Sequence, residues 1–295
     1  MALRALYDVP APAKLNLFLH VVGRRADGYH LLQSVFVPID WADTLHFERR
    51  DDARLRRHDL GPPLPVDDLC LRAAALLQRD SGTAFGADIS VDKRVPWGAG
   101  LGGGSSDAAT TLLALNRLWG LHWSRERLLA LAPRLGADVA FFVGGRAAFV
   151  EGIGERLTPI DLPPMRFVVV KPTATVSTPA VFASKRLVRD TEPVILSGFL
   201  ARLAAGGASP FGRNDLQPVA EAQCAEVREA GQWLAARFGH SRMTGSGSAV
   251  FARIDTVALP EATGAADDVL DTLPAGWTGR RCRSLPTHPL EGWAD

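Results

Sequence analysis

Cysteine is scarce in this chain of 295 residues, and the three that occur, Cys70, Cys224 and Cys282, lie far apart. Because they are odd in number and form no C-x-x-C pair, the sequence predicts neither a disulfide framework nor a zinc site. The seven histidines are scattered, which disfavours any metal site built from protein ligands. A reducing compartment suits such a chain, and we expect a cytoplasmic protein.

Excess charge and long apolar runs are also absent. Lysine and arginine total 33 against 32 acidic residues, so nothing in the net charge attracts nucleic acid or an acidic membrane. No run of about 18 apolar residues and no signal-peptide pattern occurs. We therefore expect a small-molecule partner, with no nucleic-acid or membrane binding, and a monomer or homodimer. An anionic ligand must be bound by local groups.

Lysine is rare among the basic residues. Only Lys14, Lys93, Lys171 and Lys185 occur, and all the other basic residues are arginines. A lysine here is therefore a candidate for a position that needs a compact ammonium group, which a planar guanidinium cannot replace.

Helical and strand patterns mix without a regular βαβ alternation, which favours an α+β fold. The clearest strand, residues 13–22, alternates so that Lys14 and Asn16 lie on one face. Prolines 159, 163 and 164 mark a predicted boundary between domains 1–160 and 161–295. Further predictions are helices at 67–79, 105–119, 124–134, 178–188, 218–238 and 266–273, a hairpin at 147–160, strands at 166–171 and 280–285, and a glycine turn leading into a strand at 243–254.

The strongest signal is P-W-G-A-G-L-G-G-G-S-S-D at residues 96–107, followed by a helical pattern. Glycines let backbone N–H groups converge on a ligand, and a helix start adds unpaired donors and a positive dipole end. The segment therefore predicts an anion site, favouring phosphates. It lacks the second strand of the dinucleotide fingerprint and the lysine of the Walker motif. The alternative is a flexible surface loop or a tight strand-to-helix connection, and Pro96 and the amphipathic helix disfavour a linker.

Three weaker signals accompany it. The strand carrying Lys14 and Asn16 could alone be a surface strand. Asp138 in L-G-A-D-V-A-F-F has apolar neighbours, which predicts a desolvated carboxylate with a cationic partner or a task, the alternative being a helix N-cap. The turn M-T-G-S-G-S-A-V-F at 243–251 could approach a ligand, or be only a hairpin.

P-A-K-L-N-L at 12–17, P-x-x-x-G-L-G-G-G-S-S-D at 96–107 and T-G-S-G-S at 244–248, in that order, resemble the three motifs of the GHMP small-molecule kinases. The match spans most of the chain. The resemblance implies an N-terminal α/β domain of the ribosomal-protein-like fold, a C-terminal ferredoxin-like α/β domain, and an active site in the cleft between them.

Three further segments, G-R-R-x-D-G-Y-H at 23–30, L-G-A-D-V-x-F-F at 135–142 and T-P-A-V-F at 178–182, resemble one branch of that family. Its members use ATP to phosphorylate the 2-hydroxyl of a cytidine diphosphate-linked sugar alcohol in non-mevalonate isoprenoid synthesis. The reaction asks for positioning and charge neutralisation more than for covalent chemistry.

The resemblance implies ATP and Mg²⁺ as cofactors. Asp138 would accept the proton of the substrate hydroxyl, and Lys14 would hold that hydroxyl and the transferring phosphoryl group. Mg²⁺ would bridge phosphate oxygens with waters and the hydroxyl of Ser105 or Ser106. The implied nucleotide-binding residues are Lys93, Pro96, Gly98, Gly100, Leu101, Gly102, Gly103, Gly104, Ser105, Ser106 and Asp107.

The resemblance also implies where the substrate lies. Its cytosine would stack between Tyr29 and Phe182, with His30 binding the polar edge of the base. Asn16 and Thr178 would hold the diphosphate or the polyol.

This sequence departs from the branch at a few positions. Asp68 and Asp107 stand where asparagine is common, which puts acidic groups near the adenine side, and Ala140 replaces a usual proline. Two alternatives stay open. One is another GHMP kinase, acting on a mevalonate derivative, homoserine or a sugar. The other is a nucleotide-binding regulatory module without turnover, which the presence of both Lys14 and Asp138 disfavours.

Overall fold

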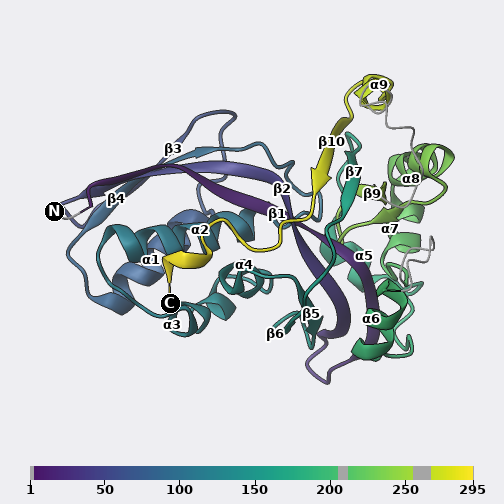
Figure 1. Ribbon diagram of the computed structural model, residues 1–295, viewed down its shortest axis with the longest axis horizontal. Coiled ribbons are helices and arrows are strands. Elements are labelled where there is room, and N and C mark those ends of the chain that lie inside the picture. The colour runs from purple at the N-terminus through teal and green to yellow at the C-terminus, as the bar shows by residue number, and fades with distance from the viewer. Residues whose placement is uncertain (1–2, 205–211, 255–266, 295) are drawn as a thin grey trace.

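The computed structural model describes residues 3–204, 212–254 and 267–294. These residues form an elongated molecule with two parts, each built around its own sheet (Figure 1). Within the described residues all strand-to-strand pairs but one are antiparallel, and a single βαβ unit is not continued into a regular alternation, so the predicted α+β class is confirmed.

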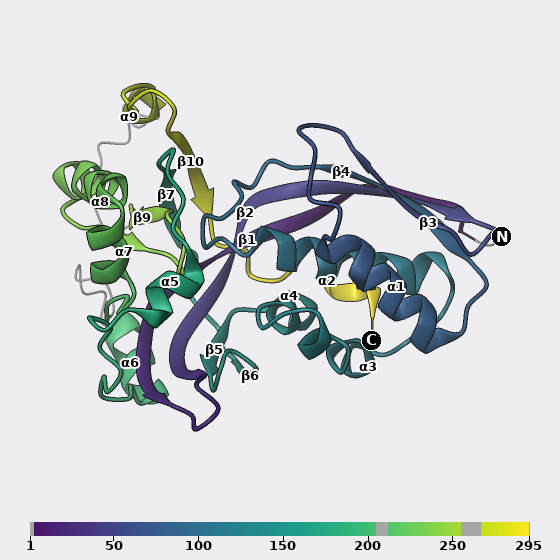
Figure 2. The same ribbon diagram turned by 180° about the vertical axis from the view of Figure 1, so that it is seen from behind.

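A six-stranded sheet, within the described residues, is the frame of the larger part. Its strands are β1 (Ala5–Arg24), β2 (His30–Arg50), β3 (Leu55–Asp59), β4 (Gly86–Asp92), β5 (Ala148–Glu151) and β6 (Arg156–Pro159). The order is β3-β4-β2-β5-β6, and β1 pairs with β2. The β1–β2 hairpin is far longer than an ordinary one, and its tip reaches the smaller part (Figures 1 and 2).

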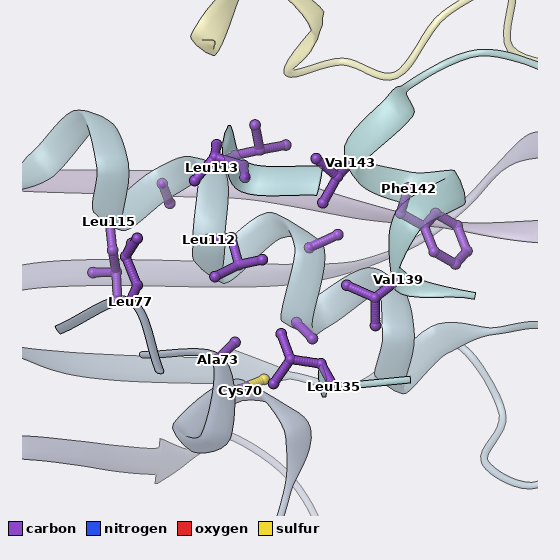
Figure 3. Packing of buried hydrophobic residues seen from close by; sticks show 14 of the residues in the cluster. Cys70, Ala73, Leu77, Leu112, Leu113, Leu115, Leu135, Val139, Phe142 and Val143 are labelled. Carbon is purple, nitrogen blue, oxygen red and sulfur yellow. The ribbon is translucent and has the colours of Figure 1, made fainter. Parts of the chain in front are cut away.

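Helices α1 (Leu69–Ser81), α2 (Gly103–Leu118), α3 (Arg125–Leu129) and α4 (Val139–Gly144) cover one face of this sheet (Figure 1). Helix α2 packs against β1 and β2 and against α1 and α4. Leu112 and Leu113 of α2 lie in a core with Leu77 of α1 and Val143 of α4 (Figure 3). Almost every residue of α2 from Ser106 to Leu118 is buried, the polar ones included, and this burial anchors its N-terminal turn, where the glycine loop ends.

The smaller part has a four-stranded antiparallel sheet within the described residues, in the order β10-β7-β9-β8. Its elements are β7 (Arg166–Lys171), β8 (Arg242–Met243), β9 (Val250–Arg253), β10 (Thr278–Arg283), α5 (Thr178–Ala183), α6 (Leu196–Ala204), α7 (Gln217–Gln223), α8 (Ala225–Phe238) and α9 (Asp267–Asp271). Its core joins Val168 of β7 and Leu234 of α8 to Leu19 and Val21 of β1.

Segments near both ends of the chain pass from one part of the molecule to the other. The backbone N–H of Leu19 donates to the carbonyl of Arg213 at 2.9 Å, so the tip of the β1–β2 hairpin belongs to the smaller part. In return, the N–H of His288 donates to the carbonyl of Gly145 at 2.6 Å, and Leu290 is buried in the core of the larger part. The division at residue 160 stays a prediction, and these contacts make the two parts mutually dependent.

Several predicted elements match the structure: the hairpin is β5–β6, the strand at 166–171 is β7, and the helix at 67–79 is α1 with Asp68 as its N-cap. The glycine helix begins two residues early, at Gly103, because Gly102 at φ +74° forms its N-cap. The last strand covers 278–283, not 280–285, and α9 covers 267–271 of the predicted 266–273, whose residue 266 lies outside the described residues.

Three helix predictions are wrong in their extent. The helix at 124–134 stops at Leu129, and a 3₁₀ turn follows whose Pro133 has no N–H to donate. The helix at 218–238 is interrupted at Cys224, whose backbone is extended. The helix at 178–188 stops at Ala183, for a reason given below. The alternation of 13–22 is also interrupted, by a register shift between Asn16 and Leu19, and strand residues 13–21 are all buried.

Candidate active site

One cavity of about 790 Å³ lies where the hairpin, the glycine loop and α5 meet. Its walls come from both parts of the molecule, because β1 and the start of β2 face α5 and the turn at 245–246 across it. The structure thereby brings together residues that are far apart in the sequence. All the predicted catalytic and substrate residues line it: Lys14, Asn16, Tyr29, His30, Asp138, Thr178 and Phe182.

Lys14 is the buried charge of this cavity. Its side chain is 4% exposed, its Nζ donates to Asn16 Oδ1 at 2.5 Å and lies 3.5 Å from Asp138 Oδ2. The ammonium also lies over the ring of Phe36, 4.3 Å from the centroid. Burial lowers the pKa of Lys14, and the Asp138 carboxylate opposes that shift. Gly102 makes this placement possible, since a Cβ there would lie 3.2 Å from Lys14 Cγ and 3.0 Å from the Phe142 ring.

Asp138 stands directly before α4, at the N-cap position, but its side chain makes no capping hydrogen bond. It faces Lys14 instead. The expectation of a desolvated carboxylate is wrong, because the Asp138 side chain is 28% exposed through the cavity. Burial removes water from the ammonium of Lys14 rather than from the carboxylate of Asp138, which is the cavity-facing partner of the pair.

Asn16 orders the neighbourhood of Lys14. Its amide Nδ2 donates to Ser34 Oγ at 2.9 Å, and its backbone N–H donates to Thr244 Oγ1 at 3.0 Å. The Thr244 hydroxyl donates back to Asn16 Oδ1 at 3.2 Å. Ser34 was missed by sequence reasoning, since a lone hydroxyl residue gives no signal, and Thr244 was noted only as part of the T-G-S-G-S motif, with no role assigned to it. Contact of Asn16 with the diphosphate or polyol stays a prediction.

The glycine loop surrounds a second, smaller cavity of about 220 Å³. Ser105 lines both cavities, whereas Ser106 is fully buried and its hydroxyl has no partner among the described residues. Of the two serines proposed near Mg²⁺, Ser105 is therefore the accessible one. The wall includes Lys93, Pro96, Trp97, Gly98, Gly100, Leu101, Gly102, Gly103, Gly104 and Ser105, of which Trp97 is 67% exposed and was not predicted.

The glycine turn at 244–248 supports this loop. A Cβ on Gly247 would lie 2.1 Å from the Ala99 carbonyl carbon, and one on Gly100 would lie 2.2 Å from the Thr244 oxygen. Two backbones can approach this closely only without side chains. The turn therefore packs against the glycine loop, and only Gly245 and Ser246 of it line the large cavity.

A buried group of three charges lies beneath the glycine loop. Lys93 Nζ bonds Asp107 Oδ2 at 2.6 Å and also bonds the fully buried Asp43. Asp43 Oδ1 accepts the backbone N–H groups of Arg94 at 2.6 Å and Val95 at 2.7 Å, which ties β2 to the start of the loop. Burial lowers the pKa of Lys93, but the two carboxylates outweigh it and raise that pKa. Asp43 was missed because its partners are remote in sequence.

Asp68 and Asp107, the two acids noted near the adenine side, both have partners within the protein. Asp68 caps α1 by accepting the Leu71 N–H at 3.0 Å, and it pairs with Arg57. Asp107 lies under the loop against Lys93, and burial, reinforced by Asp43, raises its pKa to about 7. Their negative charges are therefore partly neutralised by the protein itself.

The raised pKa of Asp107 makes stability depend on pH. Its native pKa, about 7, lies above the unfolded value of about 4, so stability falls as pH rises between these values. We expect the free energy of unfolding of wild type, relative to Asp107→Asn, to fall by about 3 to 4 kcal/mol from pH 4 to pH 8. Urea unfolding across that range measures it. A constant difference would contradict an acid held protonated at this place.

The far end of the large cavity carries aromatic rings. The His30 and Phe182 ring centroids are 5.1 Å apart with an interplanar angle of 34°, and Tyr29 is 60% exposed at the rim. Thr178 Oγ1 lies 2.7 Å from Ser246 Oγ. Arg189 Nε donates to His30 Nε2 at 3.0 Å, a contact that sequence reasoning missed because arginine is common in this chain. Stacking of a base between Tyr29 and Phe182 stays a prediction.

Comparison with known proteins gives the family. Residues 68–146 match the model of the GHMP kinases N terminal domain, and residues 199–275 match that of the GHMP kinases C terminal domain. The 4-diphosphocytidyl-2-C-methyl-D-erythritol kinase of Methylibium petroleiphilum is 64% identical over 299 residues, covering 100% of both chains. That of a Polaromonas species is 54% identical and covers 99% of this chain and 95% of its own.

A crystal structure of 4-(cytidine 5'-diphospho)-2C-methyl-D-erythritol kinase matches with a TM-score of 0.78 at 38% identity, covering 93% of this chain and 98% of that one. The chain belongs to the 4-diphosphocytidyl-2-C-methyl-D-erythritol kinases, a branch of the GHMP kinases. As a member of this branch it is an ATP-using small-molecule kinase, and the predicted family, branch and two-domain architecture are confirmed. Within the described residues, no helix has the length and apolarity to cross a membrane.

Proposed function

We propose that this protein transfers the γ-phosphoryl group of ATP to the 2-hydroxyl of 4-diphosphocytidyl-2-C-methyl-D-erythritol, in the non-mevalonate isoprenoid pathway. One observation carries the proposal. The Lys14–Asp138 pair lies beside the glycine loop in the same cavity whose far end presents Tyr29, His30 and Phe182. A substrate with a nucleobase at one end and a reacting hydroxyl at the other fits that arrangement.

Asp138 has the role of base. In the transfer, the substrate oxygen forms a bond to the γ-phosphorus, the bond from that phosphorus to the β-bridging oxygen breaks, and the hydroxyl proton passes to the Asp138 carboxylate. Its partial exposure to the cavity leaves an oxygen within reach of a bound hydroxyl.

Lys14 has the role of charge stabiliser. Its ammonium has three N–H groups, one of which is used by Asn16 and one directed at Asp138. No other described side chain accepts the third, so it can bind an oxygen of the transferring phosphoryl group. In a site of low polarity, this fixed positive charge is worth more than it would be in water.

The nucleotide would lie along the glycine loop. The loop ends at the N-terminus of α2, whose first N–H groups have no helical partner and which carries no side-chain cap. The Ser105 hydroxyl at this turn suits Mg²⁺ held mainly by phosphates and waters. The ion would supply neutralisation of phosphate charge.

We also propose that the protein works in the cytoplasm, as a monomer or homodimer and without nucleic acid. Three free cysteines and balanced charge support this. The alternative is a GHMP kinase for mevalonate derivatives, homoserine or sugars.

The test is ADP formation by the purified protein with Mg-ATP and each of four alcohols. We expect turnover with 4-diphosphocytidyl-2-C-methyl-D-erythritol and rates at least about 100-fold lower with mevalonate, homoserine and galactose, because only the first fills both ends of the cavity. Equal or faster turnover of another alcohol, or no turnover with the cytidyl substrate, would contradict the proposal.

A further inference from the structure

The guanidinium of Arg189 binds four acceptors at the aromatic end of the large cavity. Its Nε donates to His30 Nε2 at 3.0 Å, and one terminal nitrogen donates to the Leu187 carbonyl at 2.9 Å. The other donates to the carbonyls of Phe182 at 3.1 Å and Ser184 at 2.8 Å. A single side chain therefore connects the start of β2 with the end of α5.

These contacts explain why α5 is short. In a longer helix, the Phe182 carbonyl would accept the N–H of Arg186, but that N–H donates to Ser184 Oγ at 3.2 Å. Arg189 occupies the Phe182 and Ser184 carbonyls instead. The helix ends where the guanidinium binds, and the Phe182 ring is left beside the His30 ring.

We propose that Arg189 is a positioning residue for base recognition: it fixes His30 as a hydrogen-bond donor toward the cavity and holds Phe182 beside it. Arginine has only donors, so His30 Nε2 must accept, and the ring proton of a neutral imidazole must then lie on Nδ1. Burial, with the charges of Arg189 and Arg24, lowers the pKa of His30 and keeps the ring neutral at pH 7.

A proton on Nδ1 of His30 determines which base the cavity can bind. No described residue bonds Nδ1 of His30, and His30 lines the cavity, so its N–H is available to a ligand acceptor. Cytosine offers acceptors at N3 and O2, whereas uracil carries a hydrogen on N3. A fixed donor therefore favours a cytosine nucleotide over a uracil one, because the uracil N3–H would face another N–H. The inference deepens the proposed function and rests on it for the identity of the base.

The first test reads the tautomer directly in the full-length protein. With ¹⁵N-labelled histidine, and His30→Gln to assign the signal, we expect long-range ¹H–¹⁵N spectra at pH 7.5 to place the His30 proton on Nδ1. Arg189→Met should shift the ring toward the Nε2–H form. Arg186→Met is the matched control, since Arg186 is exposed on the same segment, and it should leave the signal unchanged. A wild-type proton on Nε2 would overturn the proposal without any variant.

The second test measures recognition. Arg189→Met should raise KM for the cytidyl substrate about tenfold and leave kcat and the KM for ATP within about twofold, since the lost bonds lie away from the glycine loop. The wild-type preference for CDP over UDP in binding should shrink by a similar factor. Arg189→Lys keeps the charge but cannot bind all four acceptors, so it should behave like Met. Unchanged KM and base preference in both variants would overturn the proposal.

The two failures are distinguishable. If the wild-type protein does not phosphorylate the cytidyl substrate, the proposed function fails, while the tautomer and CDP-binding measurements still decide the role of Arg189. If the wild type turns over normally and Arg189→Met changes neither the tautomer nor base preference, only the role of Arg189 fails.

Discussion

Asp138→Asn should lower kcat by about 10³-fold while leaving KM for both substrates within about threefold. Asparagine keeps the shape and can still approach Lys14, but it cannot accept the hydroxyl proton. Asp138 makes no capping hydrogen bond, so its replacement should leave the start of α4 intact, and the melting temperature should fall only through the lost counter-charge of the buried Lys14. Steady-state kinetics with both substrates, together with thermal unfolding, measure these quantities.

Asp27→Asn is a suitable control. Asp27 lines the same cavity but pairs with Arg25 at 2.7 Å and lies on the loop between β1 and β2. Its kcat should stay within about threefold of wild type, because exposed ion pairs contribute little. If Asp138→Asn also kept near-normal kcat, the assignment of Asp138 as the base would be wrong.

Lys14→Met should lower kcat by about 10²–10³-fold, the range typical of losing one group that stabilises developing charge. Methionine keeps most of the side-chain volume among Phe36 and Gly102, so the cavity should keep its shape. Because Lys14 is buried and its pKa is lowered by burial, removing the ammonium should not reduce stability, and the melting temperature should stay equal or rise.

A lower kcat together with an unchanged or higher melting temperature would show that Lys14 acts in catalysis and not in folding. Lys171→Met is the matched control, since Lys171 is also buried but donates to the carbonyls of Ala174 at 3.0 Å and Thr173 at 3.3 Å. Its loss should lower the free energy of unfolding, because those carbonyls lose their donor. It should leave kcat unchanged, because Lys171 does not line the large cavity. A Lys14→Met enzyme that is unstable, or that keeps more than about a tenth of kcat, would contradict the proposed role.

The parts of the site that could be predicted are those whose chemistry is local in sequence. The glycine segment at 96–104 must come close to another backbone, and the structure brings it against Thr244 and Gly247. Lys14 and Asn16, two residues apart on a strand, lie side by side as predicted, with their polar atoms 2.5 Å apart. Residues two apart on a strand point to the same face of the sheet, whatever tertiary contacts form later.

What could not be predicted depends on partners remote in sequence. Asp43 meets Lys93 across 50 residues, and Arg189 meets His30 across 159, without any pattern to pair them. The same long-range contacts explain wrong predictions. Arg189 shortens α5, and Lys14, rather than Asp138, is the desolvated partner because Gly102 and Phe36 enclose it.

The most direct measurement is a ³¹P NMR time course of stoichiometric Mg-ATP and 4-diphosphocytidyl-2-C-methyl-D-erythritol with the purified protein, followed by ¹³C–³¹P coupling in the product. A kinase with the geometry described here should form ADP and one phosphomonoester in equal amounts, with the new phosphorus coupled to C2 and the diphosphate intact. ADP without a phosphomonoester, phosphate on another carbon, or cleavage of the diphosphate would contradict the proposed placement of the 2-hydroxyl between Asp138 and Lys14.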